Sequence, residues 1–225
     1  MTSPSSRGAA IGLAAAGLLL GVGGMLHPRV DTSVGYEQGM AGMFESSTWT
    51  GAHALTLAGF MLLAVSLTLL VRNFGPEWSR GRRLIGWAAV AGAGIAAVES
   101  VPHLLAASEA DAMLAHGSTP LSDLHSALQA ISTPAVGLSV AALALATARS
   151  RALGSGRVVA AIALVGGVAF ALAGPVIAIT ENSALSPLFV GSAGLSIWLI
   201  ASGVRTARRL SAAEMTGRLA TAPAR

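Results

Sequence analysis

Six long runs of apolar residues, separated by short polar segments, dominate the chain. Each run has about 20 residues, the length that an α-helix needs to cross roughly 30 Å of hydrocarbon. The runs do not alternate between apolar and polar positions, as the strands of a membrane β-barrel do. The pattern therefore predicts an all-α fold, a polytopic membrane protein whose single domain is a six-transmembrane-helix bundle in the lipid bilayer. The predicted spans are 8–26, 52–71, 84–105, 125–147, 158–180 and 185–204.

The longest connection between predicted spans is residues 27–51. Within it Tyr36, Met40, Met43 and Phe44 recur at helical spacing, and Trp49 stands just before the second span. This spacing predicts a short amphipathic helix at the membrane interface.

Composition supports the membrane interpretation and excludes several kinds of chemistry. Hydrophobic residues make up 53% of the chain and charged residues 11%, against about 25% charged residues in a soluble domain. The absence of cysteine excludes disulfides, thiolate zinc sites, iron–sulfur clusters and covalent c-type haem. All basic residues are arginine, and alanine and glycine are abundant, which indicates a GC-rich bacterial genome and hence a bacterial plasma-membrane protein.

The arginines also predict the orientation. With the N-terminus in the cytoplasm, thirteen of the fourteen arginines fall on the cytoplasmic side, five of them in the tail 205–225, and only Arg29 lies outside. The positive-inside rule therefore predicts that both termini are cytoplasmic. Because these arginines lie in short loops beside apolar spans, the high isoelectric point does not indicate binding of nucleic acid.

Two features of the spans leave alternatives open. Arg7 followed by an apolar run resembles a secretory signal peptide, but an A-x-A cleavage motif is missing, so an uncleaved first helix is expected. Outward-going spans end at His27-Pro28, at Pro102-His103 and at Pro175. This similarity suggests three pseudo-repeated hairpins.

Histidines gather at the predicted outer face. His27, His53, His103, His116 and His125 all lie in outer loops or at outer helix ends. Three of them, His53, His103 and His125, stand at the ends of successive helices. Because packed helices lie about 8–10 Å apart, their side chains are expected to converge in one pocket.

Glu99 is the only ionisable side chain well inside a predicted span. A charge near the centre of a span costs about 3 kcal/mol on insertion scales, so such a residue usually faces a partner or a cavity. Glu99 lies four positions before His103 and therefore shares its helix face. The candidate metal or haem ligands are accordingly His53, His103, His125 and Glu99.

Other polar residues could support this site. The candidates for supporting the ligands or lining the pocket are Asp123, Gln129, Glu181, Asn182 and His27. Asp123 could also cap the fourth span, Gln129 could bond across helices, and Glu181 with Asn182 could cap the fifth. The loop carboxylates, Glu109 among them, are expected to be solvated.

Three classes of function remain open. Three histidines with a carboxylate could hold zinc, two histidines on facing helices could ligate a b-type haem, and outer methionines with imidazole would suit copper. Alternatively, the protein is a non-catalytic subunit or interaction protein of a membrane complex, or a homo-oligomer, in which the polar cluster stabilises loops. A small permease or proton-coupled carrier is the third class.

Overall fold

The computed structural model describes residues 4–150, 153–180 and 182–220, and the regular structure in these ranges is entirely helical. Six helices in this part of the chain are long and apolar enough to cross a membrane. The prediction of an all-helical fold with six helices long and apolar enough to span a membrane is therefore confirmed. The long helices are α1 (Pro4–Leu26), α3 (Trp49–Phe74), α4 (Arg80–Leu105), α6 (Pro120–Thr147), α7 (Arg157–Thr180) and α8 (Gly191–Ala220).

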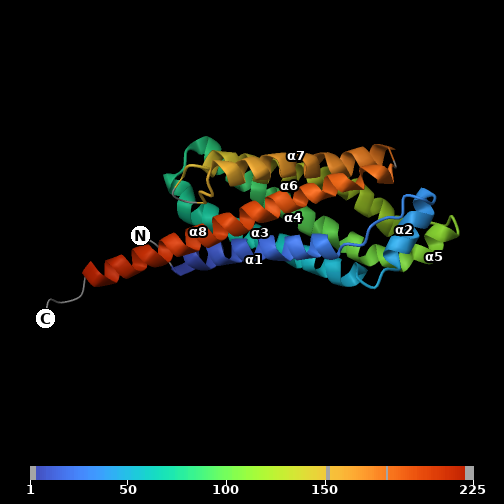
Figure 1. Cartoon of the computed structure of the whole chain (residues 1–225), viewed down its shortest axis with the longest axis horizontal. Helices are drawn as coiled ribbons and strands as arrows, with labels where there is room; N and C mark the ends of the chain where they lie inside the picture. The colour runs from blue at the N-terminus through green and yellow to red at the C-terminus, as the bar shows by residue number, and fades with distance from the viewer. Residues whose placement is uncertain (1–3, 151–152, 181, 221–225) are drawn as a thin grey trace.

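The long helices form a closed bundle (Figure 1). Each packs against the next in chain order, and α8 returns to pack against α1. The interior is filled by one apolar cluster to which all six helices contribute, including Leu13, Leu63, Leu143 and Trp198. This arrangement brings the C-terminal ends of α1 and α4 and the N-terminal ends of α3 and α6 together at one end of the bundle.

Most helices begin a few residues before the predicted spans because capping, not polarity, sets their ends. The Ser79 side chain accepts a hydrogen bond from the Arg82 amide at the start of α4, and Pro120 occupies the first turn of α6. The last predicted span, 185–204, needs a correction. A 3₁₀ segment (Ser183–Val190) precedes α8, and α8 continues through Ala220, so the predicted cytoplasmic tail begins as helix. Arginine and alanine are good helix formers, so leaving the apolar region does not end the helix.

A small helical cap covers the end of the bundle opposite the two termini (Figure 1). The helix predicted in the first loop is present as α2 (Tyr36–Phe44), and it packs against α5 (Ala110–Leu114). Met43 and Phe44 belong to an apolar cluster with Trp49 and Met113. The apolar face of α2 is therefore covered by protein instead of lying free for a membrane interface.

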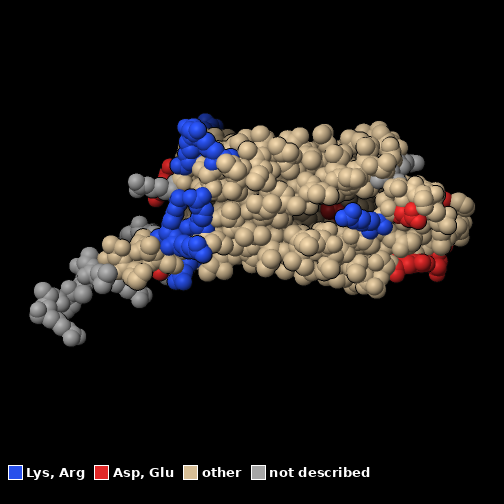
Figure 2. Space-filling model, in the orientation of Figure 1, with Lys and Arg blue, Asp and Glu red and all other residues tan. Residues whose placement is uncertain are grey.

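Charges are distributed unevenly along the bundle (Figure 2). Basic side chains gather at the end that carries both termini, and a broad band without charge separates them from the acidic side chains of the opposite end. A few acidic side chains also lie at the basic end, and one basic side chain lies near the acidic end.

Candidate metal centre

Four successive long helices deliver the polar side chains at the capped end of the bundle. Glu99 continues the inward face of α4, where Ala89, Ala93 and Ala96 are also buried at intervals of three or four residues. His53 on α3 and His125 on α6 occupy inward positions in the same way. His27 directly follows α1, whose helical hydrogen bonding extends to its amide. The apolar periodicity of each helix therefore aims these side chains at one another.

The first group consists of Glu99, His103 and His125. The Oε1 atom of Glu99 lies 2.6 Å from His125 Nδ1 and 3.6 Å from His103 Nδ1. Glu99 and His125 are both buried. The short approach lacks the angles of a hydrogen bond, and both atoms have no hydrogen-bond partner in the described part of the chain. Three potential metal-ligand atoms thus lie close together, and no hydrogen bond joins Glu99 Oε1 to His125 Nδ1.

Gln129 contacts the His125 ring from the next turn of the same helix, α6. Its side-chain amide lies 3.2 Å from His125 Nε2. The oxygen and nitrogen of an amide can exchange places by rotation. With its oxygen in this place the amide accepts a hydrogen bond from Nε2–H, which leaves the Nδ1 lone pair directed at Glu99. Bonds of this kind fix the ring orientation of metal-ligating histidines in proteins.

The second group consists of His27, His53 and His103, whose nearest potential ligand atoms lie within 4.8 Å of one another. His27 Nδ1 lies 2.7 Å from the Pro28 carbonyl oxygen, and His53 Nδ1 lies 2.7 Å from the Trp49 carbonyl oxygen. Each Nδ1–H donates to its carbonyl, which leaves the Nε2 lone pair free. Partial burial lowers the pKa of the His27 imidazole below its ordinary value, so this ring is neutral at neutral pH.

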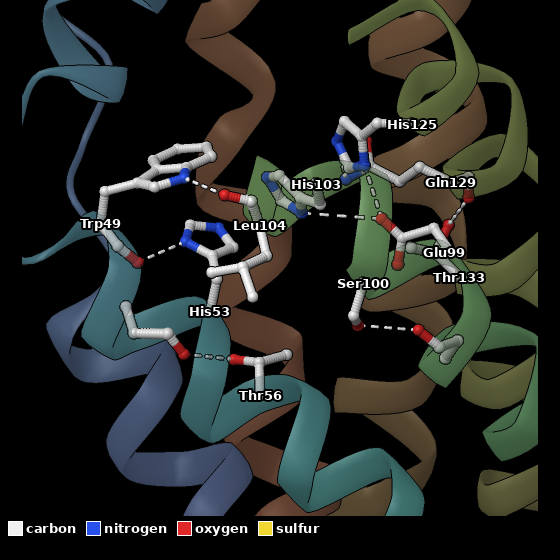
Figure 3. A network of polar contacts seen from close by, with 12 residues as sticks. Trp49, His53, Thr56, Glu99, Ser100, His103, Leu104, His125, Gln129 and Thr133 are labelled. Carbon is white, nitrogen blue, oxygen red and sulfur yellow. Dashed lines mark hydrogen bonds and ion pairs between the residues drawn. The ribbon is translucent and has the colours of Figure 1, made fainter. Parts of the chain in front are cut away.

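His103 belongs to both groups and lies between His53 and the Glu99–His125 pair (Figure 3). Its ring stacks on His125 with a centroid distance of 3.6 Å and meets His53 edge-on at 4.2 Å. The structure therefore brings together His53, His103, His125 and Glu99, the four side chains whose convergence the sequence predicts. Their role as ligands stays a prediction.

Trp49 is a site residue that the sequence analysis assigned only to the loop before the second span. Its side chain is buried, lies 3.8 Å from the His53 ring between centroids, and donates from Nε1 to the Leu104 carbonyl oxygen at 3.2 Å. Its own carbonyl accepts from His53. Trp49 therefore holds His53 in place from two sides. Its position four residues before His53 on the inward face was the available signal.

Two of the predicted pocket residues, Asp123 and Asn182, do not join the site. Asp123 is exposed, and the Asn182 side chain accepts from the Ala184 amide at the start of the 3₁₀ segment. Glu181 lies outside the described residues.

Glu109 was expected to be solvated, and this expectation is wrong. Its buried carboxylate accepts from the amides of Leu121 and Ser122 at 2.8 and 2.9 Å. Glu109 therefore caps α6, the role that Asp123 could have taken. Free amides at a helix start favour a carboxylate, and here the carboxylate comes from the 3₁₀ segment Ala106–Glu109, which precedes α5.

The methionines do not support a copper site built on thioether ligands. Met25 is exposed, whereas Met43 and Met113 pack in the apolar cluster of the cap. These side chains serve packing, which is the more usual role of methionine.

Comparison with known proteins found no matching family model, no matching curated protein and no matching solved structure. The class of the protein is therefore assigned from its fold and site. It is a multi-pass α-helical membrane protein with a buried histidine–carboxylate cluster at one end of its bundle.

Proposed function

We propose that the protein binds a divalent transition-metal ion, with zinc the best match, between Glu99, His103 and His125. The observation that carries this proposal is the approach of Glu99 Oε1 to His125 Nδ1 at 2.6 Å without hydrogen-bond geometry, with His103 Nδ1 at 3.6 Å. Two donors of a tetrahedral zinc ion lie about 3.3 Å apart at bond lengths of about 2.0 Å. The observed distances bracket this value, and a rotation of the stacked His103 and His125 rings would direct both Nδ1 lone pairs at one ion.

The donor types also favour zinc. Two imidazoles and one carboxylate form a set that zinc accepts readily, with a fourth position left for water. A haem would need a porphyrin plane between two axial imidazoles. The stacked rings of His103 and His125, and the contact of His53 with His103, leave no space for a plane between those pairs. The geometry therefore supports an ion over a haem.

The placement of buried charge favours binding over transport. Among the described residues, the fully buried ionisable side chains are His53, Glu99, Glu109 and His125, and all lie at the outer end. A proton-coupled carrier usually needs polar stations at the membrane midplane. This proposal is also compatible with a protein that acts as a subunit of a membrane complex or as a homo-oligomer.

Zinc content of the purified full-length protein tests the proposal. After treatment with a chelator and dialysis against zinc, wild-type protein should retain at least one ion per chain. His103→Ala should abolish retention, because His103 belongs to both groups. The matched control is His116→Ala, since His116 is exposed and pairs with Glu37 on the cap surface. Equal zinc content in wild type and His103→Ala would overturn the proposal.

We also propose that both termini face the cytoplasm of a bacterium and that the site faces outward. The clustering of basic side chains at the end that carries both termini supports this orientation. A fluorescent reporter that matures only in the cytoplasm should be bright after Arg225 and dark after Ala115, which lies in the outer cap. A dark fusion after Arg225 would reverse the assignment. The three pseudo-repeated hairpins stay a prediction.

A further inference from the structure

We propose that the cluster holds a second metal ion between His27, His53 and His103, and that the His103 ring bridges the two ions as an imidazolate. This inference rests on the proposed metal site and goes beyond it. The two groups have no ligand in common except His103. The cluster would thus be a dinuclear centre, with one ion on the carboxylate side and one on the all-histidine side.

His27 and His53 are positioned by contacts that do not involve the first group. His27 and His53 are both held by backbone carbonyls through Nδ1, so both offer Nε2. The His53 side chain is 2% exposed, and its Nε2 has no hydrogen-bond partner in the described part of the chain. A buried polar atom without a partner is destabilising, because it has lost its hydrogen bonds to water. A ligand that accepts this lone pair, such as a metal ion, would remove the cost.

The orientation of His103 divides its two nitrogens between the groups. Nδ1 lies toward the Glu99 carboxylate at 3.6 Å. The nitrogen left for His27 and His53 is therefore Nε2, and the His53 ring contacts His103 edge-on at 4.2 Å. A neutral imidazole has one lone pair, so occupation of both sites requires that His103 release its remaining N–H proton to water. The imidazolate then donates one lone pair to each ion.

The charges are partly balanced within the cluster. Two divalent ions bring four positive charges, and the Glu99 carboxylate and the His103 imidazolate offset two of them. The open coordination positions can take hydroxide from water, since His27 is only half-buried at the outer end of the bundle. The imidazolate lies between the ions and reduces their mutual repulsion, so binding at the two sites should be coupled.

Zinc stoichiometry distinguishes this inference from the proposed function. Wild-type protein in detergent, titrated with zinc against a chelating indicator, should bind two ions per chain. His27→Gln and His125→Gln should each bind one, and His116→Gln, the control at an exposed position, should bind two. One ion per chain in the wild type, with no change in His27→Gln, would overturn the second site and leave the first intact. No bound zinc would overturn both.

Copper(II) serves as a spectroscopic probe of the bridge in the same wild-type protein. Two copper ions joined by an imidazolate couple magnetically, so the paramagnetic resonance signal should fall well below that of two isolated ions. In His27→Gln the signal should correspond to one uncoupled ion. Two copper ions with full, uncoupled intensity in the wild type would show that His103 does not bridge them and would overturn this part of the inference.

Discussion

Glu99→Gln should lower the zinc affinity of the first site by at least 10–100-fold. This range is typical for loss of a residue that only supports a metal ligand, and the Glu99 Oε1 atom is itself placed as a ligand at 2.6 Å from His125 Nδ1. Glutamine keeps the shape of the side chain but removes the charge that offsets a bound cation. The affinity is best measured by chelator competition in the His27→Gln background, where only the first site is complete.

The matched control is Glu109→Gln at the same end of the bundle. Glu99 is 6% exposed and Glu109 is 7% exposed, so the two changes neutralise equally buried carboxylates. Glu109 accepts two amide hydrogen bonds at the start of α6. Its replacement should reduce the free energy of unfolding by about 1–3 kcal/mol and leave zinc affinity unchanged. The reverse pattern, with Glu99→Gln changing only the melting temperature, would show that Glu99 is structural.

The spans could be predicted because membrane crossing constrains length and polarity together. Glu99 stood out for the same reason, since a carboxylate inside an apolar run needs a partner. Its buried position and its contacts with His103 and His125 agree with the prediction that it faces the bundle interior. The approach of His53 to His103 followed from their shared place at helix ends.

Contacts between residues far apart in the sequence were harder to predict. His27 was assigned only a supporting role because it lies beyond the end of α1, and the path of the chain there depends on packing against Trp49 and His53. The capping of α6 by Glu109 joins residues twelve and thirteen positions apart. Local sequence favoured Asp123, the carboxylate nearest to the helix start. Such contacts depend on how the outer loops fold over the bundle, which hydrophobic periodicity does not encode.

Gly137→Leu should destabilise the bundle strongly, because α6 and α7 meet there backbone to backbone. A Cβ atom at Gly137 would lie 2.6 Å from the Gly167 carbonyl oxygen and 3.0 Å from the Ala171 amide nitrogen. A Cβ at Gly167 would likewise lie 2.6 Å from the Gly137 carbonyl oxygen. Backbone atoms cannot move aside as side chains can, so the helices must separate. Small residues allow this close approach between membrane helices.

The decrease in the free energy of unfolding should exceed the roughly 1–3 kcal/mol typical of overpacking, because the clash is with backbone and the substituent is large. It should appear as a lower melting temperature in detergent and as loss of zinc retention, since α6 also carries His125. The control is Gly94→Leu on α4, where a Cβ would meet no atom within 4 Å. Leucine there should be neutral or slightly stabilising, because it favours helix more than glycine does. Equal melting temperatures for the two variants would contradict the close packing of α6 on α7, and with it the placement of His125 beside Glu99.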